Sequence, residues 1–526
     1  MSSNSNQNIF QNLKSDIPAS IVVFFVAIPL CLGIALASGV EDNLFSGLIA
    51  GIIGGIVVGL ISGSQIGVSG PAAGLAAIVL GAIKELGSFE IFLVAVVLGG
   101  LIQILFGILR LGIIGYYFPS SVIKGMLTGI GIIIIMKQIP YFLGISKDTW
   151  DNTSALDFAA IFSNLELGAV LIGCISIAIL LFWSGVLAKK AKIFNLIQGP
   201  LAVVVLGVIY YLTTQGSSIQ VSQFNLVNVP VPKDIDSFFG QFTFPDFSAI
   251  WNKDVWIVAF TIALVASLET LLCVEATDKL DPQKRITPTN RELFAQGIGN
   301  SLSGLIGGLP ITQVIVRSSA NIQSGGKTKA SAVIHGFLLL ISVIAIPNLL
   351  NLIPFSVLAA ILFIVGFKLA KPKLFVEMYQ NGWKQFVPFI ITVGGIAITQ
   401  DLLIGIGLGL AVGIVVILWK SYKNSHFLHI QDVSNGIKRI KMRLAEEVTF
   451  INKGAILKEL NKIEDNSALE IDMRATKFLD YDIIEIFEDF ADHAKASNIN
   501  FKIIAKDHEL VNPEASTIAL ELAPTL

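Results

Sequence analysis

The chain has 526 residues, of which 54% are hydrophobic and only 14% are charged, with a formal net charge of -2. Soluble domains carry about 25% charged residues, so this composition excludes an ordinary soluble protein and indicates one that crosses a membrane many times. The near-neutral charge gives no reason to expect a nucleic-acid partner. The three cysteines have neither metal-site nor disulfide spacing, so we expect no metal and no bound cofactor.

The first residues, 1–16, are polar and are expected to form a cytoplasmic tail. A membrane-spanning helix needs about 20 residues, with a range of about 17–25. Apolar segments of this length follow along the chain at 17–38, 45–63, 92–110, 120–139, 167–188, 194–213, 255–276, 291–307, 330–347, 354–370, 385–400 and 402–420.

Two further apolar segments are interrupted by glycine and proline. One is Ser69-Gly70-Pro71, which leads into an apolar stretch at 75–83, and the other begins with Gly308-Leu309-Pro310. When both are counted as crossings, lysine and arginine gather in the loops on the cytoplasmic side, as membrane topology requires. Leaving out either one spoils this pattern. The sequence therefore predicts an α-helical membrane domain of fourteen elements at 17–423, with both ends in the cytoplasm.

The interrupted segments are the third and tenth of the fourteen, which are matching positions in two halves of seven. An odd number of crossings in each half makes the second half inverted relative to the first. Short interrupted segments at equivalent places in inverted halves indicate the substrate site of a secondary transporter. Non-helical backbone persists at membrane depth only where protein or a wet cavity surrounds it.

Arg317 follows the second interruption, and no acidic residue occurs in 311–323. A lone arginine in the bilayer costs at least about 2.5–3.5 kcal/mol on insertion scales, which favours a functional reason for it. Helix N-termini carry about half a positive charge, so two facing half-helices and a guanidinium form a cradle for an anion. The alternative is that Arg317 only snorkels or caps a neighbouring helix.

Glu269 is a second charge inside an apolar span, and residues 269, 273 and 276 share one helix face. A carboxylate at this depth can take up a proton or hold Na⁺, and it can equally form a structural salt bridge with Arg317. The sequence leaves these alternatives open, so the coupling ion is expected to be H⁺ or Na⁺.

The composition changes after residue 423. Residues 424–526 are mixed and charged, and we expect strands at 437–444, 468–473 and 501–505 and helices at 452–462 and 480–496. This alternation predicts a small cytoplasmic α/β domain. In the second helix, Ile483, Ile484, Phe487 and Phe490 are expected on one buried face.

Several long motifs resemble the SulP family of anion transporters, and the tail resembles a STAS domain. The motifs are VAIPLCLGIALASG (26–39), SGPAAG (69–74), PSSVIKGMLTGIGI (119–132), NRELFAQGIGN (290–300), GGLPITQVIVRSSANIQSGGKTKASAVIHG (307–336) and, in the tail, EIDMRATKFLDYDIIEI (470–486). The resemblance implies a uracil-permease-like fold with a 7+7 inverted repeat, a homodimer and elevator-type exchange of access.

The resemblance also implies where the ligands bind. The anion is expected between the third and tenth half-helices, at Ser69, Gly70, Ala72, Gln313, Val314, Ile315, Val316 and Arg317. Coupling to a cation is expected at Glu269 and Cys273. Cysteine is a poor Na⁺ ligand, which favours a proton. In the tail, Met473 and Arg474 follow Asp472 where phosphorylated STAS domains carry a serine two residues after the aspartate, so regulation by that phosphorylation is not expected.

These observations predict a secondary active transporter, not an enzyme, that carries sulfate or bicarbonate across the plasma membrane. An uncoupled anion exchanger or channel of the same fold is the first alternative. A nucleobase permease is a second, although its pattern needs an acidic residue within 311–323. A membrane-anchored signalling scaffold with the tail as its working part is a third.

Overall fold

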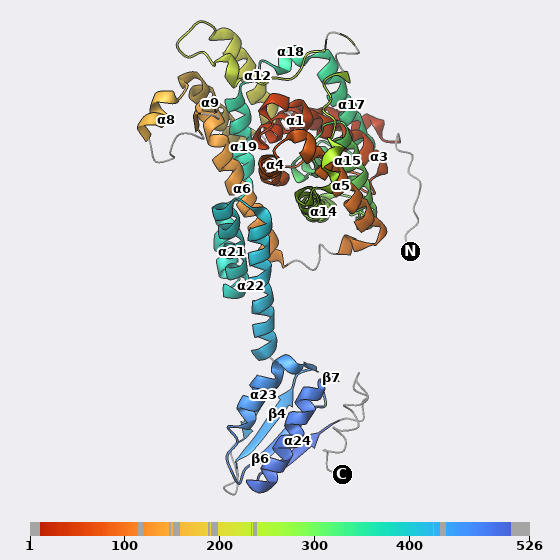
Figure 1. Ribbon diagram of the computed structural model, residues 1–526, viewed down its shortest axis with the longest axis vertical. Helices are drawn as coiled ribbons and strands as arrows, with labels where there is room; N and C mark the ends of the chain where they lie inside the picture. The colour runs from red at the N-terminus through yellow and green to blue at the C-terminus, as the bar shows by residue number, and fades with distance from the viewer. Residues whose placement is uncertain are drawn as a thin grey trace. The chain divides into compact units, whose positions relative to one another are not determined.

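The computed structural model describes residues 11–113, 119–146, 149–150, 158–187, 190, 198–232, 234, 239–423, 426–431 and 438–505. The chain forms two compact units, Met1–Leu410 and Ala411–Leu526. The first is helical and the second is an α/β unit (Figure 1).

The first half of the helical unit supplies seven successive elements. They are α1 (Leu13–Ala37), a helix running through α2 (Phe45–Ile53), η2 (Gly54–Val58) and α3 (Gly59–Ile61), β1 (Ser69–Pro71) with α4 (Ala73–Leu86), α5 (Phe89–Ile108), α6 (Ser120–Leu143), α9 (Leu167–Phe182) with η4 (Trp183–Leu187), and α12 (Gly199–Thr213). A short helix, α8 (Phe158–Asn164), precedes α9.

The second half repeats this series. Its elements are α14 (Lys253–Leu280), α15 (Thr289–Leu305), β2 (Ile311–Gln313) with α16 (Ile315–Gln323), α17 (Ala330–Ala345), α19 (Phe355–Leu369), α21 (Trp383–Thr399) and α22 (Leu402–Lys423). Short helices α18 (Pro347–Leu350) and α20 (Pro372–Gln380) lie between them. In both halves the third element is a short strand followed by a half-helix, so the predicted fold class is confirmed.

The length and composition of these helices fit a membrane protein. Within the described residues, seven helices are long and apolar enough to cross a bilayer, among them α1, α5, α6 and α14. Shorter apolar helices lie between them, including α12, α17 and α21. The chain is therefore a multi-pass membrane protein.

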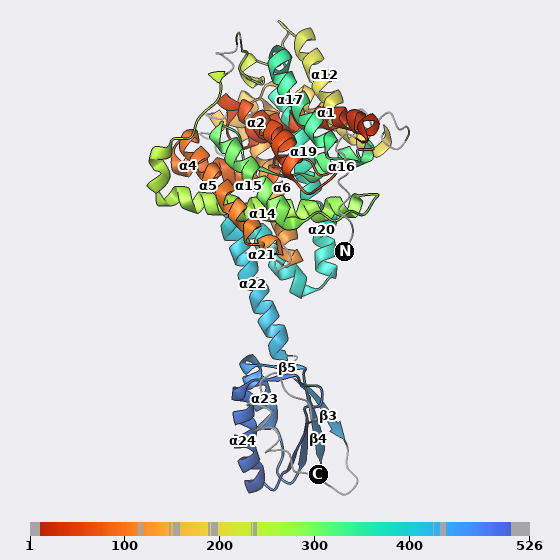
Figure 2. The same ribbon diagram turned by 90° about the vertical axis from the view of Figure 1, so that its right-hand side faces the viewer.

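The helices pack into two groups, and each half contributes to both. The core group consists of residues 13–108 and 253–345, in which α5 packs on α14 and α15 and α1 packs on α17. The flanking group consists of α6, α9, α12, α19 and α21, in which α6 packs on α19 and α21. Figure 1 shows the core group in red and green beside the flanking group in orange and teal, and Figure 2 shows α14 running across the core group. The two groups meet where α1 and α4 contact α19 and α6.

The second unit contains a four-stranded sheet in the order β3 (His426–Gln431), β4 (Arg439–Leu444), β6 (Ala468–Asp472) and β8 (Asn500–Ile504). Strand β3 is antiparallel to β4, and the other neighbours are parallel. Two helices accompany the sheet, α23 (Lys453–Leu460) and α24 (Tyr481–Ala496), with a small pair of strands formed by β5 (Glu447–Val448) and β7 (Phe478–Leu479). This agrees with the predicted alternation, and residues 506–526 of the tail lie outside the described residues.

Helix α24 places its predicted apolar face in the core of this unit. Ile483, Ile484, Phe487 and Phe490 are all buried. They pack in one cluster with apolar residues of the sheet and of α23. Asp480 begins the helix as its N-cap and accepts a hydrogen bond from the backbone N–H of Asp482.

Asp472, at the end of β6, forms a forked ion pair with Arg474. The arginine Nε and Nη2 atoms donate to the two carboxylate oxygens at 2.9 and 2.7 Å. The side-chain hydrogen bond from Arg474 holds the pKa of Asp472 well below its usual range, although burial opposes this. A depressed folded-state pKa stabilises the unit above the unfolded value of about 4, and this stability is lost as the pH falls further.

We expect Asp472→Asn to loosen the β4–β6 region at neutral pH. Hydrogen bonds to charged groups contribute roughly 1.5–3 kcal/mol, and the exposure of Arg474 places this pair near the lower end, so amide exchange in these strands should quicken about tenfold at pH 7. Hydrogen–deuterium exchange of the full chain measures it. The difference from wild type should shrink at pH 3. Asp492→Asn, which removes an exposed pair with Lys495 on α24, is the control. Equal exchange in wild type and Asp472→Asn at pH 7 would contradict the assignment.

Candidate functional site

The two chain interruptions meet inside the core group as a two-stranded antiparallel sheet. Gly70 of β1 pairs with Thr312 of β2. Each strand leads directly into a half-helix through an extended N-cap residue, Ala72 before α4 and Val314 before α16. Neither N-cap side chain accepts a hydrogen bond from its helix. Both half-helices therefore begin beside the β1–β2 pair, and the amide groups of their first turns are not satisfied by the side chains of their own N-cap residues.

Helix α15 contacts the β1–β2 pair from one side through buried side-chain amides. The Asn300 side chain accepts a hydrogen bond from the Ile311 N–H at 2.5 Å and donates to the Ile311 carbonyl oxygen at 3.0 Å. One turn earlier, Gln296 donates to the Ser69 hydroxyl at 2.8 Å. Each strand of the β1–β2 pair is thus hydrogen-bonded to a side chain of α15.

Helix α14 forms hydrogen bonds with the same β1–β2 pair through threonines. The Gln313 backbone N–H donates to the Thr270 hydroxyl at 3.3 Å, and the Gln313 side-chain amide donates to the Thr277 hydroxyl at 3.1 Å. Gln313 is fully buried by these contacts. Its side chain therefore serves to join β2 to α14.

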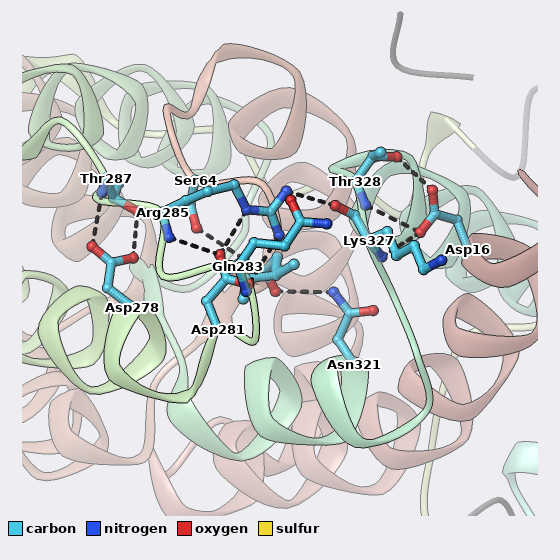
Figure 3. A network of polar contacts seen from close by, with 12 residues as sticks. Asp16, Ser64, Asp278, Asp281, Gln283, Arg285, Thr287, Asn321, Lys327 and Thr328 are labelled. Atoms are coloured by element: carbon cyan, nitrogen blue, oxygen red, sulfur yellow. Dashed lines mark hydrogen bonds and ion pairs between the residues drawn. The ribbon is translucent and has the colours of Figure 1, made fainter. Parts of the chain in front are cut away.

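The far end of α16 is tied down by a polar network at the ends of three segments (Figure 3). The Asp16 carboxylate accepts hydrogen bonds from the backbone N–H groups of Lys327 and Thr328 at 2.7 and 3.1 Å. Arg285 donates to the Lys327 carbonyl oxygen at 2.8 Å and pairs with Asp281 at 2.6 Å. These bonds connect α1, the α14–α15 loop and the α16–α17 loop, and so restrict movement of α16 within the core group.

Arg317 lies in the first turn of α16 and is only 1% exposed. Its Nη2 atom donates to the Cys31 sulfur at 3.2 Å, whereas Nε and Nη1 have no hydrogen-bond partner. The guanidinium lies against Gly70, where an added Cβ would collide with Nη1. A side chain at position 70 would therefore require the guanidinium to move. A buried cation with two unpaired donors next to a helix N-terminus is a site prepared for a negative charge.

Glu269 and Cys273 lie on α14, facing the starts of the two half-helices. The Gly74 N–H, in the first turn of α4, interacts with the Glu269 carboxylate, and the Ile315 N–H, in the first turn of α16, interacts with the Cys273 sulfur. Glu269 is 9% exposed, and its Oε2 atom has no hydrogen-bond partner. No ion pair joins Glu269 to Arg317, although both are described residues, so the structural salt bridge considered from the sequence does not form.

A cavity of about 180 Å³ lies at this place, where the core and flanking groups meet. Six of the ten sequence-predicted site residues line it: Val314, Ile315, Val316, Arg317, Glu269 and Cys273. The other four do not line the cavity. They are Ser69, Gly70, Ala72 and Gln313, and all four are buried in the β1–β2 pair or next to it.

Further residues that were not predicted from the sequence also line the cavity. The first interruption contributes Pro71, Ala73 and Gly74, which lie two or three positions further along than the expected Ser69, Gly70 and Ala72. The flanking group contributes Leu127 and Ile130 from α6 and Val365 and Leu369 from α19. The glycine and proline pattern pointed to the first set, but leucine, isoleucine and valine in apolar helices carry no local signal that they face a cavity.

Gly74 offers a test of the contact between α4 and Glu269. A Cβ at this position would lie 2.6 Å from Glu269 Oε2, so Gly74→Ala must displace the carboxylate or the helix start. We expect this substitution to lower the anion uptake predicted from the sequence at least about tenfold, because it displaces Glu269 or the start of α4, which are expected to bind the ligands. Uptake into liposomes measures it.

The matched control is Gly81→Ala in the same helix. A Cβ there meets nothing within 4 Å, and alanine favours a helix over glycine, so transport should be unchanged. If both substitutions lower uptake equally, the contact between Gly74 and Glu269 has no special importance.

The profile of the Sulfate permease family matches residues 13–392. "Putative sulfate transporter YvdB" of Bacillus subtilis is 29% identical over 363 residues, which cover 67% of this chain and 64% of that protein. "Bicarbonate transporter BicA" of Picosynechococcus is 28% identical over 355 residues, which cover 67% of this chain and 59% of that protein. The chain thus spans about 60% of the length of these relatives.

Solved structures resemble the fold as well. The transmembrane domain of a cyanobacterial bicarbonate transporter BicA superposes with a TM-score of 0.61 and 26% identity, covering 76% of this chain and 98% of that chain. The murine anion transporter Slc26a9 in its inward-facing state gives a TM-score of 0.75 over 97% of this chain and 88% of that chain. At 15% identity, this second similarity concerns the fold alone.

Proposed function

Because the chain belongs to the sulfate permease family, with a family match over residues 13–392, we propose that it is a secondary active transporter of a small inorganic oxyanion, sulfate or bicarbonate. In this proposal it is not an enzyme and uses no cofactor. It acts in the plasma membrane as a homodimer with both termini in the cytoplasm, and residues 424–526 form a STAS-like domain.

The observation that carries the proposal is the state of Arg317. It is buried beside the start of α16, and two of its donor nitrogens have no partner. Burying an ionised group without a counter-charge is costly, and here the uncompensated charge borders a cavity into which Glu269 also faces. A mobile anion would supply the counter-charge while it is bound.

The coupling to a cation follows from a competition for the start of α4. The Glu269 carboxylate interacts with the Gly74 N–H, which is one of the groups an anion would use. An ionised Glu269 would also repel an anion in the same cavity. Protonation of Glu269 removes the repulsion and frees the helix start, so proton and anion bind together. A Na⁺ ion beside the carboxylate would neutralise it in the same way.

The position of the cavity favours an elevator-type exchange of access. One wall belongs to the core group, through α1, α4, α14 and α16, and the opposite wall to the flanking group, through α6 and α19. The polar ties of α16 lie within the core group. A rigid core group that slides along the flanking group would carry the anion with its binding residues.

Uptake of labelled sulfate and bicarbonate into proteoliposomes, under imposed H⁺ or Na⁺ gradients, tests this function. The account predicts uptake that is saturable, driven by one of the two gradients and abolished when that gradient is collapsed. Saturable flux that ignores both gradients would support the exchanger or channel instead. Competition by uracil would support a nucleobase permease. Absence of any anion flux would contradict transport.

A further inference from the structure

The cavity has two chemically different sides. At one side lie the starts of α4 and α16 with Arg317 and Glu269. The opposite side consists of aliphatic residues of the flanking group, Leu127 and Ile130 from α6 and Val365 and Leu369 from α19. Among the described residues that line the cavity, none is a serine, threonine, asparagine, glutamine or tyrosine. Hydrogen-bonding groups therefore meet a ligand from one direction only.

An inorganic oxyanion bound in this cavity could form hydrogen bonds on one side only. Its negative charge is spread over oxygens on all sides, and oxygens facing aliphatic walls would lose water without gaining a hydrogen bond, which is costly. The cavity of about 180 Å³ has room for more than a small oxyanion, since one water takes about 30 Å³ in the liquid. Space remains beside the aliphatic wall when an anionic group lies at Arg317.

We propose that this cavity also binds monovalent organic anions in which one charged head carries a short unbranched apolar tail, of the alkanoate or alkanesulfonate type. The head lies at Arg317 and the starts of the half-helices, and the tail lies along Leu127, Ile130, Val365 and Leu369. This inference rests on the proposed anion site and extends its range of substrates.

The charges of the cavity select against two related classes of ligand. A dicarboxylate with its second charge at the tail end would place that charge against aliphatic side chains, where no described lining residue donates a hydrogen bond. A neutral alcohol would leave Arg317 without a counter-charge. A single head charge also limits repulsion by Glu269.

The test is a chain-length series measured by equilibrium binding to the purified full chain in lipid nanodiscs. The probes are the straight-chain alkanesulfonates from methane- to hexanesulfonate and the alkanoates from formate to hexanoate, with sulfate and bicarbonate as inorganic references. Sulfonates keep their charge at neutral pH, so they do not enter the lipid as neutral acids. Affinity should rise about three- to fourfold for each added methylene, equivalent to about 0.8 kcal/mol per buried CH₂, until the tail outgrows the cavity.

Variants locate the effect. Leu127→Ala removes part of the aliphatic wall on α6 and should reduce the gain in affinity per methylene at least twofold. Met136→Ala, at a position 45% exposed on the same helix, is the control and should leave the affinities of the series unchanged. Arg317→Ala should lower the affinity for every chain length by at least about tenfold. Sulfate or bicarbonate binding in the Leu127→Ala variant shows that its site is intact.

The outcomes separate this inference from the transport proposal. Arg317-dependent binding of inorganic anions with no gain along either series would overturn the inference and leave the proposed function standing. If Arg317→Ala leaves the binding of every anion unchanged, both the inference and the proposed function are overturned. A series measured with Arg317→Ala that keeps both the wild-type affinities and the wild-type gain per methylene would reflect partition into lipid and would also overturn the inference. A gain in only one of the two series would support it and identify the head group as carboxylate or sulfonate.

Discussion

Replacing Arg317 by alanine is expected to lower anion uptake by between about tenfold and a hundredfold, because hydrogen bonds to charged groups contribute roughly 1.5–3 kcal/mol each. The guanidinium has two unpaired donors next to the cavity. Within the part of the chain that the structure describes, Arg317 forms no ion pair with the Glu269 carboxylate that lines the same cavity. Its removal also deletes an uncompensated buried cation, so the thermal stability of the variant should equal or exceed that of wild type. Initial uptake rates in proteoliposomes and the melting temperature of the purified protein measure the two effects.

Two further variants make this result specific. Arg317→Lys keeps the charge but not the planar fork of donors, so it should retain more uptake than alanine does. Arg291→Ala removes an arginine of the core group whose Nε donates to the Ile61 carbonyl oxygen, away from the cavity lining, and should leave uptake nearly unchanged. Wild-type uptake in Arg317→Ala would show that the anion binds elsewhere.

Replacing Glu269 by glutamine is expected to abolish the dependence of transport on the coupling ion. In wild type, lowering the pH should raise uptake, because a protonated Glu269 no longer repels the anion or occupies the Gly74 N–H. Linkage of one proton limits this effect to about tenfold per pH unit. Glutamine resembles the protonated acid in shape and charge, so uptake by the variant should change less than about twofold between pH 6 and 8. Uptake at fixed membrane potential, with and without Na⁺, measures it.

The matched control is Glu275→Gln on the same helix. Glu275 is half exposed and pairs with Lys279, one turn further along α14, so the variant should keep the wild-type response to pH and Na⁺. A response that persists in Glu269→Gln would mean that another group carries the cation.

The sequence was most informative where the backbone is broken. Glycine and proline at Ser69-Gly70-Pro71 and Gly308-Leu309-Pro310 predicted interrupted crossings, and the structure has β1 with α4 and β2 with α16 at these places. Such residues act locally, because they fix or free the backbone of their own segment. Fold class and helix order could therefore be predicted without coordinates.

The lining of the site was harder to predict because it depends on packing between distant segments. Ser69 and Gln313 were expected at the anion, but each is held by a neighbouring helix, Ser69 by Gln296 and Gln313 by Thr277. Leu127 and Val365 come from helices whose apolar residues are spread over all sides and do not gather on one face. Which face of such a helix meets a cavity follows from its neighbours and not from its own pattern.

The position of a bound anion tests the central claim most directly. Crystals grown with selenate, which mimics sulfate, or with bromide as a general monovalent anion, would give an anomalous signal at the bound ion. The account predicts a peak within hydrogen-bonding distance of Arg317, between the first turns of α4 and α16. A protein that is active in uptake but binds these ions only elsewhere would contradict it.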